Sequence, residues 1–277
     1  MKVPFVKMHG AGNDYIYFDC LHSPPPADMA ALALRLSDRH KGIGGDGAVF
    51  ICPSEIADAR MRMFNADGSE GKMCGNAIRC VAKYLYDSGA VPRAEMRIET
   101  GSGVKQLACR IEGGKVRTVR VDMGPACFDP KSLPVSLQGE VVGRKVHIAG
   151  GEHAITCVSM GNPHCVVFED PDGTDLAAVG PRFECDPLFP ERVNTEFVKQ
   201  TGARSLRMRV WERGSGETLA CGTGACAAAA AAVKLGLCPR GEDISVQLLG
   251  GELMINVGDT VTMTGEAVLV FKGEIEL

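Results

Sequence analysis

The chain has 277 residues, of which 45% are apolar and 23% are charged, and this composition excludes a wholly disordered protein. Its length favours two domains. Its net charge of −4 gives no basic footprint for nucleic acid or an anionic membrane surface. The first residues lack the apolar core of a signal peptide, and the alanine run is too short to span a bilayer. We therefore expect a cytoplasmic protein with a small-molecule or protein partner.

Hydrophobic periodicity together with glycine and proline predicts the following elements. In chain order they are a helix over 27–39, a strand over 48–52, a helix over 76–87, a hairpin of strands 104–111 and 116–123, a helix over 224–235, and strands over 253–257, 261–264 and 267–271. Strands outnumber helices and do not alternate with them regularly. The pattern therefore favours an α+β fold over a doubly wound sheet.

The chain is internally duplicated. Cys74 and Cys221 are 221 − 74 = 147 residues apart, and at that offset RMRMFNADGSEGKMCGN lies over RMRVWERGSGETLACGT without a gap. The same offset lays GAVFI over NTEFV, and an offset of 162 − 13 = 149 pairs HGAGND with SMGNPH through Asn13 and Asn162. The duplication predicts two similar domains related by a pseudo-twofold axis.

Two of the twelve cysteines occupy duplicated positions in front of a predicted helix. The twelve are too sparse for a small secreted disulfide scaffold, and none has CxxC spacing, so we expect most of them to be reduced and buried. At a helix N-terminus, however, unpaired N–H groups and the macrodipole lower thiol pKa values to ~3.5–7.5 and can hold a carboxylate. For Cys74 or Cys221 alone a weak N-cap would be the better interpretation. The repeated setting favours function.

Two equivalent thiols that face each other across a cleft suit one kind of chemistry. One thiolate removes a proton from carbon while the other thiol delivers a proton to the opposite face, so the stereocentre inverts. Two helix N-termini would stabilise the charge that develops on an adjacent carboxylate. This scheme requires neither pyridoxal phosphate nor a metal, and His164 with Cys165 is only a lone pair of potential metal ligands.

Five motifs in order between His9 and Ala225 resemble the diaminopimelate epimerase family: HGAGNDY, FNADGSEGKMCGNAIRC, VSMGNPHCVVF, NTEFV and ERGSGETLACGTGA. The resemblance implies a cofactor-independent isomerase that interconverts LL- and meso-2,6-diaminopimelate for lysine and peptidoglycan synthesis. It also implies a homodimer whose protomers have two pseudo-symmetric domains, each a barrel-like mixed sheet around a central helix. The C-terminal strand should return to the first domain, which would comprise 1–122 plus 267–277, with the second at 123–266.

The resemblance also implies roles for individual residues. Cys74 and Cys221 should be the catalytic pair, and the backbone at Gly75, Asn76, Gly222 and Thr223 should hold the reacting carboxylate. The rest of the substrate should be surrounded by Asn13, Asn65, Asn162, Asn194, Glu212 and Arg213, with His164 and Glu212 tuning the thiols. A guanidinium for the distal carboxylate and a carboxylate for an ammonium agree with this assignment. One position departs from the family, because Gly47 stands where many relatives have glutamine.

The same sequence features bear on three other functions: nucleotide binding, a different isomerase activity and redox sensing. GIGGDG, residues 42–47, matches a dinucleotide fingerprint, but it follows a predicted helix and leads into a strand, which is the reverse of the required context. GTGACA, residues 222–227, opens a helix but lies some ten residues after the preceding strand. A proline-racemase-like isomerase would also use two opposed catalytic groups. A thiol–disulfide redox sensor is a further alternative, since low-pKa thiols can form a disulfide.

Overall fold

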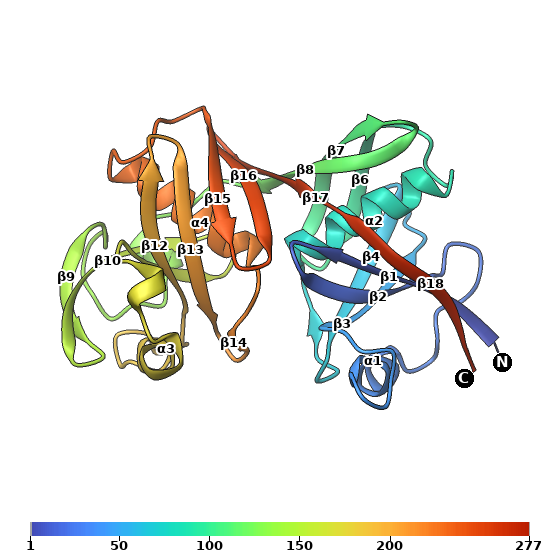
Figure 1. Ribbon diagram of the computed structural model, residues 1–277, viewed down its shortest axis with the longest axis horizontal. Helices are drawn as coiled ribbons and strands as arrows, with labels where there is room; N and C mark the ends of the chain where they lie inside the picture. Colours follow the sequence, from blue (N-terminus) through green and yellow to red (C-terminus); the bar gives the residue numbers. More distant parts are fainter. Residues whose placement is uncertain (1, 277) are drawn as a thin grey trace. The chain divides into compact units, whose positions relative to one another are not determined.

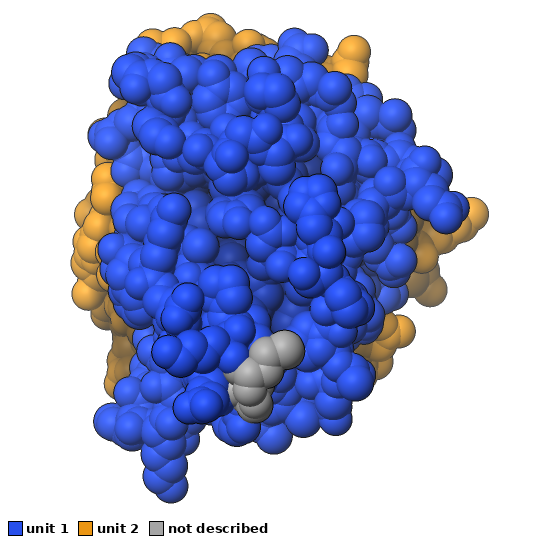
Figure 2. Space-filling view, turned by 90° about the vertical axis from the view of Figure 1, so that its right-hand side faces the viewer, with its two compact units in different colours: residues 1–121, 264–277 blue, residues 122–263 orange. Residues whose placement is uncertain are grey.

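The computed structural model describes residues 2–276 and divides into two compact units (Figures 1 and 2). The first unit comprises the chain up to Val121 together with the segment from Thr264 onward, and the second comprises Asp122–Met263. The boundaries inferred from the sequence are 122/123 and 266/267. Cys74 belongs to the first unit and Cys221 to the second. Within residues 2–276, no helix is long and apolar enough to cross a membrane.

The first unit is a mixed sheet with two helices. Its elements are β1 (Lys2–Gly10), β2 (Asn13–Asp19), α1 (Met29–Ser37), β3 (Gly47–Cys52), β4 (Ala59–Asn65), β5 (Glu70–Gly71), α2 (Gly75–Asp87), β6 (Glu95–Thr100), β7 (Gly103–Glu112), β8 (Lys115–Gly124, which crosses the unit boundary) and β18 (Val268–Glu276). β18 and β2 flank β1 and are antiparallel to it, β2 is parallel to β3, and β3 is antiparallel to β4. β4 is parallel to β6, which begins the antiparallel run β6–β7–β8. The last strand of the chain is thus part of the first sheet.

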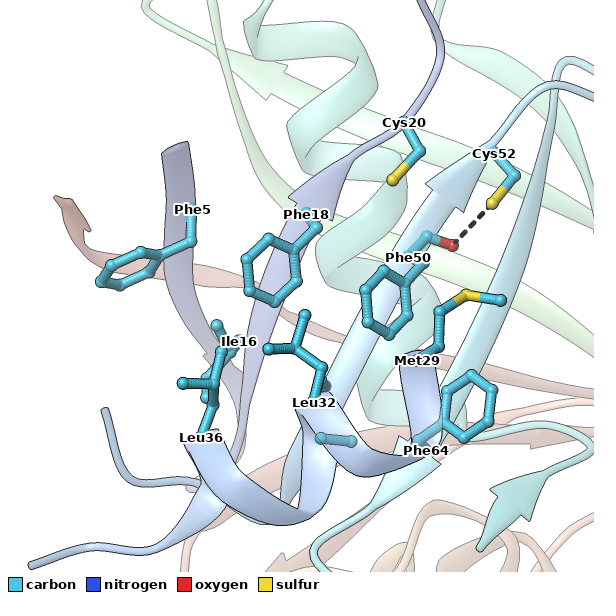
Figure 3. Packing of buried hydrophobic residues seen from close by; sticks show 12 residues of the cluster. Phe5, Ile16, Phe18, Cys20, Met29, Leu32, Leu36, Phe50, Cys52 and Phe64 are labelled. Carbon is cyan, nitrogen blue, oxygen red and sulfur yellow. Dashed lines mark hydrogen bonds between the residues drawn. The ribbon is translucent and has the colours of Figure 1, made fainter. Parts of the chain in front are cut away.

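The central strands of this unit are covered by a helix on each face, which explains why every residue of β3 is buried. On one face, Phe18 and Phe50 stack with ring centroids 5.3 Å apart against Leu32 and Leu36 of α1 (Figure 3). On the other face lies α2, which contacts β1, β2 and β7 and has a fully buried apolar stripe that includes Ile78. Alternate residues of each strand therefore face different helices.

The second unit repeats this plan. Its elements are η1 (Pro130–Ser132), β9 (Arg144–Ile148), β10 (Gly151–Ser159), β11 (Pro163–Val167), η2 (Pro171–Gly173), α3 (Leu176–Glu184), β12 (Asn194–Gly202), β13 (Ser205–Glu212), β14 (Gly216–Glu217), α4 (Gly222–Lys234), β15 (Asp243–Leu248), β16 (Gly251–Val257) and β17 (Val261–Glu266, which crosses the unit boundary). The polyalanine helix α4 contacts β10, β11, β12, β13, β15 and β16. Residues 225–232 of α4 are all buried, so the small side chains allow a sheet to close around the helix.

The strand register confirms the duplication that the sequence predicts. Ala48 pairs with Phe64 between β3 and β4, and the pair Thr195 and Trp211 between β12 and β13 lies 195 − 48 = 147 residues later. The short strands β5 and β14 pair with β4 and β13 in the same repeated register. In both units the following strand, β6 or β15, is parallel to the strand that precedes the short one. The two halves therefore share topology as well as motifs.

The α+β class and the expected helices and hairpin are confirmed, with the ends of the elements shifted by a few residues. The sequence did not predict α3, a nine-residue helix that contains Pro181. Its other helix breaker, Gly180, has a packing reason, because a Cβ there would lie 2.3 Å from Cδ2 of Trp211. Tertiary packing against Trp211 thus overrides a local pattern that is unfavourable for a helix.

Candidate active site

Both duplicated cysteines are the N-caps of the central helices, as the sequence predicts. The N–H of Ala77 donates to Cys74 Sγ over 3.5 Å, and the N–H of Gly224 donates to Cys221 Sγ over 3.3 Å. Ala77 and Gly224 are themselves equivalent, because 224 − 77 = 147. Each sulfur therefore accepts one of the N–H groups that a helix start leaves without an intrahelical partner.

The environment of Cys221 corrects one expectation from the sequence. Burial raises the pKa of the Cys221 thiol well above its usual value, and the nearby carboxylates of Glu212 and Glu196 raise it further. Hydrogen bonds from Thr223 and Gly224 act in the opposite direction but do not prevail. The helix N-terminus thus does not produce a low-pKa thiol here, because desolvation and two negative charges outweigh it.

Glu212, at the end of β13, lies directly beside this sulfur. Burial raises the pKa of its carboxyl group, against hydrogen bonds from Thr218 and Cys221 that lower it. The thiol of Cys221 and the hydroxyl of Thr218 both donate to this carboxylate. A carboxylate with a raised pKa next to a protonated thiol is a candidate acceptor for the thiol proton.

A chain of hydrogen bonds leads from Cys221 into the interior of the second unit. Thr223 Oγ1 lies 3.5 Å from Cys221 Sγ and accepts from Asn162 Nδ2 over 3.4 Å. Asn162 Oδ1 is 3.0 Å from His164 Nε2, and His164 Nδ1 is 2.7 Å from Glu196 Oε1. The side chains of His164 and Glu196 are both fully buried. His164 and Asn162, predicted from the sequence, are thereby brought into one network with the thiol.

A different set of groups surrounds Cys74. The S–H of Cys74 donates to Asn13 Oδ1 over 3.4 Å, and Asn76 Nδ2 donates to the same oxygen over 3.3 Å. Arg79, whose side chain is fully buried, donates to Asn76 Oδ1 over 2.9 Å and to the Gly75 carbonyl over 3.0 Å. The structure thus places Asn13, Asn76 and Gly75 together around the first turn of α2.

The other expected substrate ligands lie at strand ends of their own units. Asn65 ends β4 and donates from Nδ2 to Ser69 Oγ over 3.0 Å. Asn194 begins β12, donates to the Pro163 carbonyl over 2.9 Å and accepts from the backbone N–H of Arg213 over 3.0 Å. The exposed Arg213 guanidinium donates to the carbonyl of Glu191 over 3.1 Å. Asn194 therefore fixes the backbone that carries Arg213.

The backbone at Gly47, the position that departs from the family pattern, is closely packed. A Cβ at Gly47 would lie 2.0 Å from the carbonyl oxygen of Phe64 and 2.8 Å from Cε1 of Tyr15. Both distances are far below van der Waals contact, so this backbone has no room for a side chain there.

Sequence reasoning missed three residues of this region: Arg79, Asp46 and Glu196. A signal for Glu196 exists in the duplication, because its equivalent at 196 − 147 = 49 is the fully buried Val49. A carboxylate that replaces a core valine indicates a special environment. Among residues 2–276, Glu196 Oε2 has no hydrogen-bond partner. In that same range, no group of three or more His, Cys, Asp or Glu lies together as metal ligands would.

The chain is similar in sequence to one protein family over nearly its whole length. A family model described as diaminopimelate epimerase matches residues 5–128 and 156–270. The chain is 50% identical over 278 residues to a diaminopimelate epimerase of Acetivibrio thermocellus, with 99% of this chain and 98% of the relative covered. It is also 50% identical over 281 residues to a diaminopimelate epimerase of Desulfovibrio desulfuricans, with coverage of 98% and 97%.

Among solved structures, a hydroxyproline epimerase from Agrobacterium vitis superposes with a TM-score of 0.69 at 16% identity, covering 99% of this chain and 91% of that one. At this level of identity the likeness establishes a shared fold. The α+β architecture with two related units is thus common to isomerases with different substrates.

Proposed function

This chain belongs to the diaminopimelate epimerase family, and on that premise we propose that it interconverts LL- and meso-diaminopimelate. In the mechanism we propose, Cys74 and Cys221 exchange protons with the α-carbon of the substrate. The main observation in support of this mechanism is the repeated position of the two thiols. Each thiol caps a buried helix at the same place in the same strand register. Such a repeat suits a reaction that needs one proton donor and one proton acceptor of the same kind.

In the proposed reaction, one sulfur as thiolate removes the α-proton and the other as thiol protonates the opposite face of the carbon. Reversal of the roles runs the epimerisation backward. The N–H groups at the start of α2 and α4 would hold the α-carboxylate and stabilise the charge that builds up on it. Because the pKa of Cys221 is raised, this sulfur begins as a thiol, and Glu212 would accept its proton when Cys221 acts as the base.

The residues at the strand ends supply the proposed substrate contacts. Arg213 would bind the distal carboxylate through a charge-assisted hydrogen bond, and Asn65 would add a directional contact. Asn162 and His164 would act mainly by positioning the Thr223 hydroxyl beside the sulfur. The proposal keeps two expectations from the sequence, a cytoplasmic location and a homodimer, and it assigns no cofactor to the reaction.

Proton exchange in deuterated water tests the proposal. The protein is incubated with LL-diaminopimelate, and deuterium at the α-carbon is followed by NMR while the stereoisomers are separated by chromatography. We expect deuterium in the product together with inversion to the meso isomer. L-proline and trans-4-hydroxy-L-proline are tested in parallel because a structural relative is a hydroxyproline epimerase. Inversion of either imino acid without any turnover of diaminopimelate would contradict the proposal.

A further inference from the structure

The equivalent asparagines Asn13 and Asn162 present opposite ends of their amides toward their cysteines. In the first unit the amide oxygen of Asn13 lies 3.4 Å from Cys74 Sγ. In the second unit the amide nitrogen of Asn162 is directed to Thr223 Oγ1, which in turn lies 3.5 Å from Cys221 Sγ. The shared fold therefore does not determine which end of the amide faces the sulfur.

The residue that fixes the Asn13 amide is Asp46. Its Oδ2 accepts from Asn13 Nδ2 over 2.7 Å and from the backbone N–H of Asp14 over 3.1 Å. A carboxylate can only accept hydrogen bonds, so the NH2 group of Asn13 must face Asp46. The carbonyl oxygen of Asn13 is left to face Cys74 and Asn76, whose Nδ2 donates to it over 3.3 Å.

The position of Asp46 is fixed by an ion pair and by a backbone hydrogen bond. Arg39 Nη2 pairs with its Oδ1 over 2.9 Å, and the backbone N–H of Asp46 donates to the Asp14 carbonyl over 2.7 Å. The residue lies in the glycine-rich loop 42–47 between α1 and β3. This loop matches a nucleotide-binding pattern without its structural context, and in this fold it carries the carboxylate that orients Asn13.

The second unit uses other groups to set the opposite orientation. His164 Nε2 lies 3.0 Å from Asn162 Oδ1, and the ring is anchored through Nδ1 to Glu196. The contact with His164 engages the amide oxygen of Asn162, which leaves its NH2 group directed to Thr223 Oγ1. Each asparagine is therefore oriented by an acidic residue, directly in the first unit and through a histidine in the second.

We propose that Asp46 is a positioning residue that, through Asn13, keeps Cys74 in its protonated form in the substrate-free protein; this inference rests on the proposed role of Cys74 in proton transfer. An amide oxygen beside the sulfur accepts from a thiol and repels a thiolate. Cys74 is thereby prepared to deliver a proton. To act as the base, it must first give up its hydrogen bond to Asn13.

Tyr17 and Cys80 also lie near Cys74, but they do not supply this preference. Tyr17 of β2 and Cys80 of α2 are both buried and near enough to Cys74 for their pKa values to be raised by it, and both stay neutral at physiological pH. The positive charge of Arg79, which donates to Asn76 Oδ1 and to the Gly75 carbonyl, would favour a thiolate and so cannot supply this preference either. The N–H of Ala77 favours the thiolate form, and the oxygen of Asn13 opposes it.

Alkylation of Cys74 as a function of pH tests the inference without any use of substrate. The protein is treated with iodoacetamide, and modification is quantified in the tryptic peptide that follows Lys72 and ends at Arg79, which contains one cysteine. In Asp46→Ala the NH2 group of Asn13 loses its 2.7 Å hydrogen bond, and, apart from Cys74 itself, the amide keeps only the longer 3.3 Å contact with Asn76 Nδ2, so its NH2 group can turn toward the sulfur. We expect the rate of Cys74 alkylation at neutral pH to rise by about fivefold to tenfold, the effect of exchanging one hydrogen bond.

Asp46→Asn is the matched control, because its side-chain oxygen can still accept from Asn13 although the charge is lost. We expect its Cys74 alkylation profile to follow that of the wild type. If Asp46→Asn instead behaves like Asp46→Ala, the charge and not the amide orientation acts on the thiol, and the inference is wrong. An unchanged profile in Asp46→Ala would overturn it as well.

Asn13→Ala provides a second route if Asp46→Ala does not fold, as judged by circular dichroism. Removal of the amide oxygen should raise the alkylation of Cys74 to a similar extent. Alkylation of Cys221, read by fragmentation of its own peptide, should stay unchanged in every variant. Failure of the proposed function would appear separately, as an absence of diaminopimelate turnover in the wild type.

Discussion

Glu196 Oε1 lies where an alanine at position 224 would need space, since a Cβ on Gly224 would be only 2.7 Å from that oxygen. The equivalent pair in the first unit is Val49 and Ala77, both buried. Glutamate with glycine in one unit thus corresponds to valine with alanine in the other. The two substitutions compensate each other within the space between a strand and the first turn of the central helix.

We expect Gly224→Ala to lower the free energy of unfolding by about 1–3 kcal/mol, as overpacking of a core does. In a Glu196→Val background the same change should cost much less, because the pair then matches Val49 and Ala77. Urea denaturation of both single variants and of the double variant measures the coupling. An equal cost in both backgrounds would show that the contact with Glu196 is not responsible.

Serine at either proposed catalytic position, 74 or 221, should abolish epimerisation while the fold survives. A hydroxyl is a much weaker acid than a thiol, so neither Cys74→Ser nor Cys221→Ser can transfer the proton, and we expect kcat to fall at least about 100-fold. Cys127→Ser, at a half-buried cysteine outside the site, serves as the control. Substantial turnover in either active-site variant would rule out the two-thiol mechanism.

The dependence of stability on pH should reveal the buried carboxyl group of Glu212. Burial raises its folded-state pKa above 4.5, so its contribution to stability is complete below pH 4.5 and is lost as the pH rises through the folded pKa. Glu212→Gln removes this loss. The free energy of unfolding of the variant, relative to wild type, should therefore increase between about pH 4 and about pH 8. A difference that stays constant over this range would contradict the assignment.

Arg213→Lys should weaken substrate binding, because an ammonium cannot reproduce the bidentate contact of a guanidinium with a carboxylate. We expect a loss of about 1.5–3 kcal/mol, seen mainly as a higher KM. Arg209→Lys, in strand β13 directly before Arg213, is a matched control because Arg209 is paired with Glu217. If KM and kcat of Arg213→Lys equal those of the wild type, Arg213 does not contact the substrate.

The proposed homodimer can be tested at strand β18, where Leu269, Val270 and Phe271 are 39%, 52% and 44% exposed. Consecutive exposed apolar residues on a strand are a candidate association surface. Val270→Glu should shift the protein from dimer to monomer in analytical ultracentrifugation. Ile56→Glu, at an isolated apolar residue that is 58% exposed, should leave the dimer intact. Identical behaviour of the two variants would exclude this surface.

The sequence by itself determined the features that depend on local pattern or on repetition. The duplication about Cys74 and Cys221 revealed two related halves, and glycines at positions 89 and 236 marked the ends of the central helices, where both adopt positive φ. The family and its activity followed from contiguous motifs. Such features are readable because residues that lie close in the chain encode them.

Only the tertiary structure decided how Asp46 and Glu196 reach the groups around the two thiols. Asp46 reaches Asn13 across 33 residues, and Glu196 reaches His164 across 32, through the parallel pairing of β2 with β3 and of β11 with β12. No local pattern encodes these contacts. The raised pKa of Cys221 also depends on the folded structure. The helix start alone predicts a lowered value, whereas burial and the carboxylates of Glu212 and Glu196 reverse it.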